Sequence, residues 1–212
     1  MPTAPPRPLE AERWSAAWRE LGLSPPAGLA EELAAAWQEK QRAYHTIEHL
    51  ERGLALLAEF RQLAAKPAEL DLAYYFHDAI YDPKRSDNEA KSAEMARRAL
   101  LSAGASPALA ARIAELVLAT RHDAAPPDAD AALLVDVDLA ILGAGREDYD
   151  RYEKAVLIEY SFVPRFLFRR KRREILAAFL ARPAIYLTPA LRDRFEAAAR
   201  ENLARAIADL RR

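Results

Sequence analysis

Short breaks containing proline or glycine divide this sequence into segments in which apolar residues recur at helical spacing. Ser106-Pro107 and Thr188-Pro189 each pair a residue that often caps helix starts with a proline suited to the first turn. Only 6 of the 212 residues are glycine, and helix-favouring alanine, leucine, arginine and glutamate are abundant. We therefore predict an all-α fold, a single-domain helical bundle of about ten helices.

The predicted helices follow a disordered N-terminal lead at residues 1–8, and residues 9–212 are expected to form one domain. The expected ranges are roughly 9–21, 27–41, 45–64, from Pro67 to near FHDAIYDP, 88–103, 107–120, a helix holding LLVDVDLAIL, 146–160, a helix after Pro164, and 189–210. Asp87 is expected to cap the helix that starts at residue 88. VDVDLAIL alternates apolar and acidic residues, so a buried strand is the alternative there, although its neighbours favour a helix.

Composition narrows the class of protein. Apolar residues make up 51% and charged residues 30%, as in ordinary globular proteins, and the formal net charge is -1. That balance gives no general attraction to nucleic acid or anionic membrane, and no apolar run approaches the roughly 20 residues of a membrane span. The chain has no cysteine, which excludes disulfides and thiol catalysis. We expect a cytoplasmic protein with neither membrane nor nucleic acid as partner.

Histidines and carboxylates recur in apolar helical segments. The four histidines are His45, His49, His77 and His122. Asp78 follows His77 in the apolar stretch YYFHDAIYD, and Asp138 stands between Val137 and Leu139. Burying an aspartate costs several kcal/mol unless it is paired or binds a metal. Facing helices of a bundle can supply such ligands, and mixed imidazole and carboxylate groups suit Mn, Fe, Co, Ni or Zn, with Mg if carboxylates dominate. We therefore predict a divalent metal ion as cofactor.

The order His49, His77-Asp78 and Asp138 resembles the H…HD…D signature of the HD-domain metal-dependent phosphohydrolases, an all-α superfamily. Further segments resemble one bacterial subgroup of predicted HD phosphohydrolases, over about residues 42–205: RAYHTIEHL, YYFHDAIYD, SDNEAKSAEMA, ATRHD, DVDLAILGA and ENLARAIADL. The chain departs from this subgroup at Leu157, where an arginine is expected, and at Arg170, where a glycine is usual. Neither departure touches the implied metal ligands.

The resemblance implies that His49, His77, Asp78 and Asp138 bind the metal. Asp136 is the alternative to Asp138, and we expect it instead to accept a hydrogen bond from a ligand histidine or a backbone amide. The implied reaction is attack of metal-activated water on the phosphorus of a nucleotide or small phosphorylated metabolite.

Other residues are assigned to the mouth of this site. Asp78, Glu89 and His122 are the predicted catalytic residues, and Arg42, His45 and Asn88 are predicted to bind substrate. Three of these residues have a structural alternative. His45 can be a cap or surface residue, His122 can interact with a helix dipole, and Glu89 can be a capping acid. If a helix starts near His45, then His45 and His49 share one face.

Two other functions remain open. HTIEH has the H-x-x-E-H form of a zinc-peptidase signature, in which His45 and His49 would bind zinc and Glu48 would act as base. It leaves the FHD and VDVDL segments unexplained. The fold can also be a non-catalytic module that senses a nucleotide or metal or binds a partner protein.

Two features remain without an assigned role. The basic run at 169–173 can bind phosphates or RNA, but we favour a solvated helix face opposite Phe166, Ile175, Leu176 and Phe179. A homodimer through the terminal helices is possible.

Overall fold

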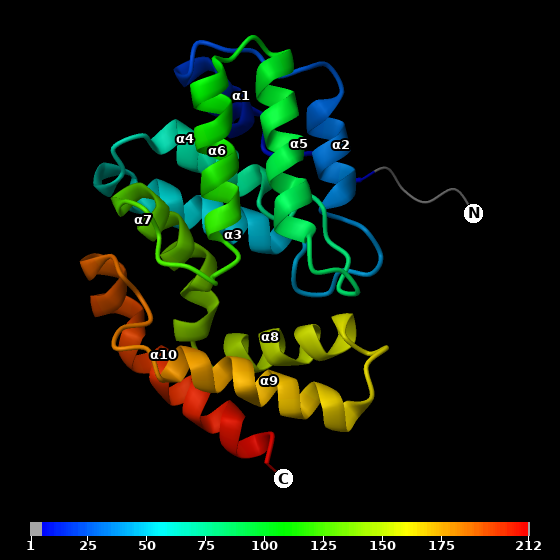
Figure 1. The fold of residues 1–212 in the computed structure, drawn as a ribbon, viewed down its shortest axis with the longest axis vertical. Coiled ribbons are helices and arrows are strands. Elements are labelled where there is room, and N and C mark those ends of the chain that lie inside the picture. The colour runs from blue at the N-terminus through cyan, green and yellow to red at the C-terminus, as the bar shows by residue number, and fades with distance from the viewer. Residues whose placement is uncertain (1–5, 212) are drawn as a thin grey trace. The chain divides into compact units, whose positions relative to one another are not determined.

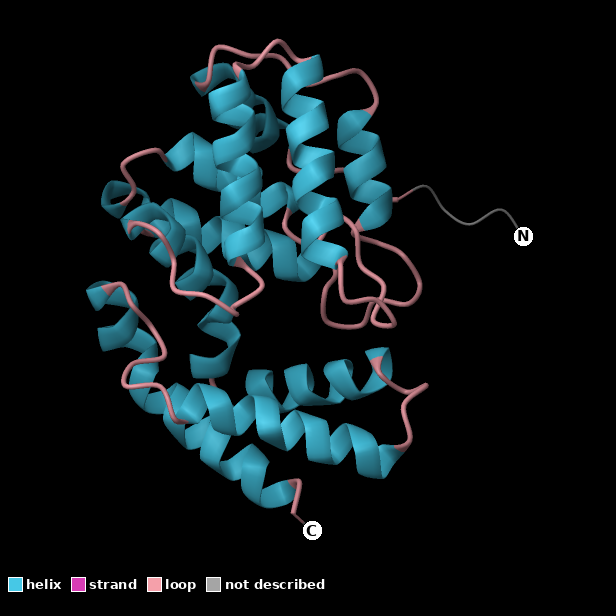
Figure 2. Ribbon diagram, in the orientation of Figure 1, coloured by secondary structure: helices cyan, strands magenta, loops and turns pink. Residues whose placement is uncertain are grey.

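The computed structural model describes residues 6–211, and all regular structure within them is helical (Figure 2). The prediction of an all-α fold is therefore confirmed. Residues 1–5 of the predicted lead lie outside the described residues. The elements are α1 (Ala11–Glu20), α2 (Leu29–Ala36), α3 (Ile47–Glu59), η1 (Arg61–Leu63), α4 (Pro67–Phe76), α5 (Asn88–Ser102), α6 (Pro107–Ala119), α7 (Ala129–Asp138), η2 (Leu139–Gly143), α8 (Arg146–Glu159), α9 (Arg165–Leu180) and α10 (Pro189–Asp209).

The chain divides into two compact units, one up to Leu134 and one from Val135 onward, so the boundary falls inside α7. The expectation of one domain over residues 9–212 stays a prediction. In the first unit α4 packs against α1, α3, α5 and α6, and α5 packs along α6 (Figure 1). In the second unit α10 packs against α9 and η2, and α8 also packs against η2.

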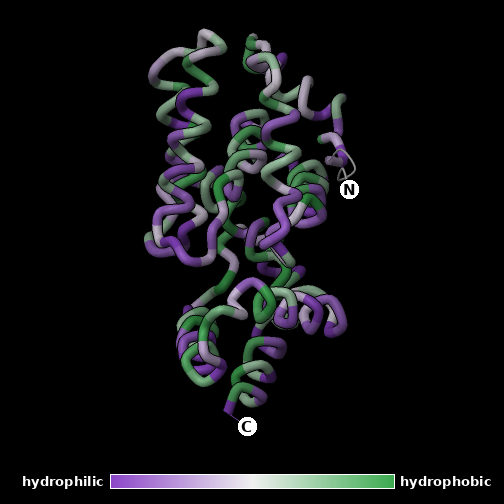
Figure 3. The backbone as a smooth tube through the Cα atoms, turned by 90° about the vertical axis from the view of Figure 1, so that its right-hand side faces the viewer, coloured by the Kyte–Doolittle hydropathy of each residue, from purple (hydrophilic) through white to green (hydrophobic). Residues whose placement is uncertain are grey.

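Helix α4 forms the centre of the first unit. Every residue from Ala68 to Phe76 is buried except Glu69, which is half-buried and pairs with Arg112. Figure 3 shows hydrophobic and hydrophilic residues interspersed along the chain. A helix that is buried on all sides belongs in a core. Trp37 fixes α4 by donating from Nε1 to the carbonyl of Tyr75, at 3.0 Å. Within residues 6–211, none of the helices combines the length and the apolar composition that a bilayer span requires.

Local signals placed several helix boundaries correctly. Ser106 caps α6, because its Oγ accepts from the amide of Leu109 at 3.2 Å. The segment holding Asp136 and Asp138 is helical up to Asp138, which confirms a helix there over a strand. Asp87 stands at the N-cap of α5 but makes no capping bond, so that prediction is wrong. Its carboxylate accepts instead from the guanidinium of Arg85, at 2.6 and 2.7 Å.

The predicted apolar face of α9 is partly wrong. Leu176 is buried, but Phe166 is 71% and Ile175 39% exposed. Phe168 and Arg172 are buried in addition to Leu176, and they follow one another at four-residue spacing, so this stripe faces the unit. Arg172 can occupy it because its guanidinium donates to the Glu153 carboxylate at 2.6 Å and to the Tyr152 hydroxyl at 2.8 Å.

Candidate metal centre

His49 lies in the first turn of α3, third after the N-cap Thr46, and is 4% exposed. Because α3 begins at Ile47, His45 precedes the helix, and the expectation that His45 and His49 share a helical face is wrong. His45 instead stacks on the Tyr81 ring, with centroids 4.3 Å apart. Tyr44 packs on His49 at 4.9 Å.

His77 and Asp78 follow directly after the last residue of α4, Phe76. His77 Nδ1 donates to the Tyr74 carbonyl at 2.7 Å, which places the imidazole proton on Nδ1 and leaves Nε2 as the basic atom. That Nε2 lies 3.2 Å from His49 Nε2 and 3.3 Å from Asp78 Oδ2. His49 Nε2 and Asp78 Oδ2 are 4.0 Å apart.

These separations suit ligands of one cation. Metal–nitrogen and metal–oxygen bonds of about 2.1 Å put two ligand atoms about 3 Å apart at a right angle and about 4.2 Å apart when opposed. The three distances in the cluster of His49, His77 and Asp78 fall inside that range. Basic atoms held so close in a buried place repel one another unless a proton or metal ion lies among them. The cluster therefore has both the donor chemistry and the spacing of a metal site.

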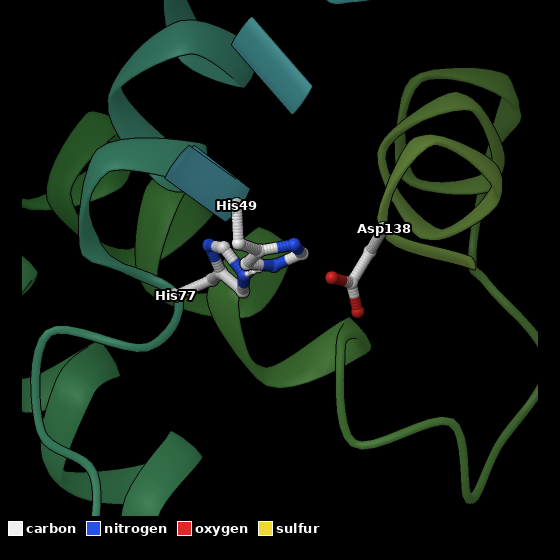
Figure 4. A group of neighbouring side chains, drawn as sticks. All are labelled: His49, His77 and Asp138. Atoms are coloured by element: carbon white, nitrogen blue, oxygen red, sulfur yellow. Dashed lines mark hydrogen bonds between the residues drawn. The ribbon is translucent and has the colours of Figure 1, made fainter. Parts of the chain in front are cut away.

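The imidazoles of His49 and His77 lie close together, with their Nε2 atoms 3.2 Å apart (Figure 4). Asp138 belongs to the second unit, so its binding to the same cation stays a prediction. Asp136 has a different role, because its carboxylate accepts from the amides of Leu187 and Thr188 at 2.5–2.9 Å. Burial raises the pKa of Asp136, although these amide bonds oppose the shift. The expected hydrogen bond from a backbone amide to Asp136 is therefore present.

The segment around Asp138 is fixed by the C-terminal part of the second unit. Tyr186 donates its hydroxyl to the carbonyl of Leu139 at 3.0 Å. Asn202, which is 6% exposed, donates to the carbonyls of Leu142 and Ala144 at 3.0 and 2.9 Å. With the amides on Asp136, these bonds fix the chain on both sides of Asp138. Nothing in the local sequence signals them, since the partners are 47–60 residues away.

Arg42 is the buried residue that supports the other side of the cluster. Its guanidinium donates to the carbonyls of His45, Asp78 and Ala79 at 2.8–3.1 Å and to the Glu39 carboxylate at 3.2 Å. It also lies over the rings of Trp37 and Tyr81, and its side chain is 0% exposed. Burial lowers the pKa of Arg42 from its ordinary value. These bonds hold the backbone that carries Asp78, so phosphate binding by Arg42 would require breaking them.

Asn88 also bonds to backbone. Its amide oxygen accepts from the amide of Asp82 at 3.2 Å, and its nitrogen donates to the Asp82 carbonyl at 2.9 Å. Glu89 lies half-buried in the first turn of α5. His122 stands three residues beyond the end of α6 with φ at 58°, a strained conformation for a residue other than glycine. The substrate-binding and catalytic roles of Asn88, Glu89 and His122 stay predictions.

The basic run at 169–173 is largely engaged within the protein. Arg169 donates to the carbonyls of Asp209 and Leu210, and Arg172 is buried against Glu153. Arg170 and Lys171 both pair with Glu174. This arrangement agrees with a helix face whose charges are balanced locally, rather than a phosphate site.

Comparison of the chain with protein-family models, with curated proteins and with solved structures found no significant match.

Proposed function

We propose that this chain is a metal-dependent phosphohydrolase of the HD-domain type, acting on a nucleotide or a small phosphorylated metabolite. The observation that carries the proposal is the cluster of His49, His77 and Asp78, with ligand atoms 3.2–4.0 Å apart. The H…HD…D order predicts Asp138, which belongs to the second unit, as the fourth ligand. Residue order and geometry thus agree on His49, His77 and Asp78.

The donor set determines which chemistry the site can support. A divalent ion held there would lower the pKa of its water to about 7 and polarise a phosphoryl oxygen. The chain's own residues hold and orient the ligands. Tyr74 fixes the tautomer of His77, and Arg42 fixes the backbone at Asp78. Four protein ligands leave two positions of a six-coordinate ion for water and substrate, so no nucleophilic side chain is needed.

The zinc-peptidase alternative fits the structure less well. It needs His45 and His49 on one helix with Glu48 beside the metal. His45 lies outside α3 and stacks on Tyr81. The Glu48 side chain is 64% exposed, accepts from the Thr46 hydroxyl at 2.6 Å and faces Arg7. His49 approaches His77 instead, at 3.2 Å.

The test uses the purified full chain, its bound-metal content, Mn²⁺ titration by calorimetry, and a panel of nucleotides and phosphoesters assayed with Mn, Co, Ni or Mg. Asp78→Asn keeps the shape of the side chain and removes its charge. The matched control is Asp87→Asn, on an exposed carboxylate that pairs with Arg85. We expect Asp78→Asn to lower the rate about 100-fold or more, which corresponds to about 2.7 kcal/mol of transition-state stabilisation. Asp87→Asn should leave the rate unchanged.

The outcomes separate the competing functions. Metal binding that is lost in Asp78→Asn, together with turnover of a phosphoester, supports the proposal. Metal binding without turnover of any substrate in the panel favours the non-catalytic sensing module. Peptide cleavage that depends on Glu48 favours the peptidase. Mn²⁺ affinity equal in wild type and Asp78→Asn would rule out the cluster as the metal site.

A further inference from the structure

Residues of α8, α9 and α10 in the second unit line a groove. Figure 1 shows these three helices. The volume of the groove is about 370 Å³, within the range of sites for small organic ligands. The residues that α8 contributes recur at three- and four-residue spacing and so share one helical face. They are Arg146, Tyr149, Asp150, Glu153, Lys154 and Leu157. None of the proposed metal ligands lines this groove.

The groove has an apolar part. Leu157, Phe168, Ala206 and Leu210 line it from all three helices. Tyr149 also lines the groove, is fully buried, and its hydroxyl lies beside the Glu153 carboxylate.

The groove is lined by three cations, Arg146, Lys154 and Arg205, and by three carboxylates, Asp150, Glu153 and Asp209. Asp150 pairs with Arg205, and Glu153 pairs with Arg172 from outside the lining. Arg146 and Lys154 have no ion-pair partner among residues 6–211 and are both exposed. They are eight residues apart on α8, which places them about 12 Å apart along the helix.

We propose that this groove binds an amphipathic organic anion. The apolar body of the ligand lies against Leu157 and Phe168, and its anionic group lies at Arg146 or Lys154. Apolar contact supplies most of the affinity, and the cations select the charge, as in other small-molecule sites. The proposal does not depend on metal binding or hydrolysis at the first site.

The probe is 1-anilinonaphthalene-8-sulfonate, an aromatic sulfonate whose fluorescence rises on binding, titrated into the full-length chain. Competitors are octanoate, octylamine and octanol, which share an alkyl chain and differ in charge. Leu157→Arg fills the apolar end with a cation, and Lys154→Glu reverses one charge. The control is Leu101→Arg, the same substitution on α5 at a leucine that is 37% exposed. Circular dichroism verifies that each variant folds.

We expect octanoate to displace the probe and octylamine to fail. Leu157→Arg should lower the affinity for the probe about tenfold, the effect of losing roughly one buried aliphatic contact. Lys154→Glu should lower this affinity severalfold. Leu101→Arg should bind as wild type. Equal affinity in wild type, Leu157→Arg and Lys154→Glu would overturn the proposal, as would equal displacement by octanoate and octylamine. A dimer in light scattering that Leu157→Arg converts to monomer would also overturn it, because the groove would then be a contact between two copies.

Discussion

The structure leaves no room for a side chain at position 53, which is occupied by Gly53. Replacing this glycine gives the sharpest stability prediction. Gly53 lies one turn after His49 on the same face of α3. A Cβ at Gly53 would lie 2.0 Å from Cζ and Oη of Tyr74. Tyr74 is 0% exposed and packs on the rings of His77 and His49, at 4.4 and 5.9 Å. The absent side chain therefore lets Tyr74 reach both histidines.

The magnitude follows from two opposed effects. Ordinary contacts begin at 3.4 Å, so the Tyr74 ring must move by about 1.4 Å (3.4 − 2.0) in a packed core. Such overpacking costs about 1–3 kcal/mol or more, and a fully buried ring at this distance belongs at the upper end. Alanine favours the helix over glycine by about 1 kcal/mol. Gly53→Ala should therefore lower the free energy of unfolding by about 2 kcal/mol, or the melting temperature by about 4–8 °C in a chain of this size.

The assay is urea denaturation followed by tryptophan fluorescence and by circular dichroism. All three tryptophans precede residue 38, so fluorescence reports the first unit, which contains Gly53. The control is Gly145→Ala, where a Cβ meets nothing within 4 Å, and the change should be a few tenths of a kcal/mol. A Tyr74→Leu background should remove most of the Gly53→Ala penalty, because it deletes the clashing atoms. Gly53→Ala as stable as wild type would refute the argument.

Three further variants test how the ligands are held. Arg42→Lys loses the planar set of donors to three carbonyls. It should weaken Mn²⁺ binding about 10-fold in calorimetry, as loss of groups that orient metal ligands commonly does. Unchanged Mn²⁺ affinity would contradict the positioning role of Arg42. Asp136→Asn removes the charge and replaces one accepting oxygen with an NH2 donor that faces the amides of Leu187 and Thr188. It should lower the free energy of unfolding by about 1–2 kcal/mol, as measured with urea, and weaken Mn²⁺ binding through Asp138. Ser106→Ala should cost about 1 kcal/mol of stability from the lost cap and leave Mn²⁺ affinity unchanged; a changed affinity would mean that metal binding merely follows overall stability.

Helix positions were predictable because the signals for them are local. The Ser106-Pro107 pair and Pro67 mark helix starts in the sequence, and the structure begins α6 and α4 there. The start of α3 was placed about two residues early, because Tyr44 and His45 continue the apolar and aromatic pattern into a loop. On α9, Arg172 is buried by its bonds to a distant glutamate and tyrosine. Helical periodicity alone predicts that Arg172 is exposed to solvent. The apolar face predicted for α9 is therefore rotated away from the face that is buried.

The candidate site was only partly predictable. Buried aspartates next to histidines, and the order of the motif, indicated which residues to compare. The approach of His49 to His77 depends on how α3 packs on α4, which no local pattern specifies. At Arg42 the sequence indicated a different role from the one observed, because a cation beside the motif suggests a phosphate contact. The structure uses its donors on backbone carbonyls instead. A single glycine within α3 was the one available hint of the close approach by Tyr74.

The ligands of the proposed site stand at helix ends, and this placement has electrostatic consequences. His77 follows the last residue of α4. The carbonyls at this C-terminal end carry partial negative charge, which favours a cation by about 0.3–1 kcal/mol. The N-terminal end of α3, at His49, carries partial positive charge, which disfavours a cation by a similar free energy. Adjacent residues inside a helix point about 100° apart, whereas His77 and Asp78, beyond the end of α4, bring Nε2 and Oδ2 to 3.3 Å.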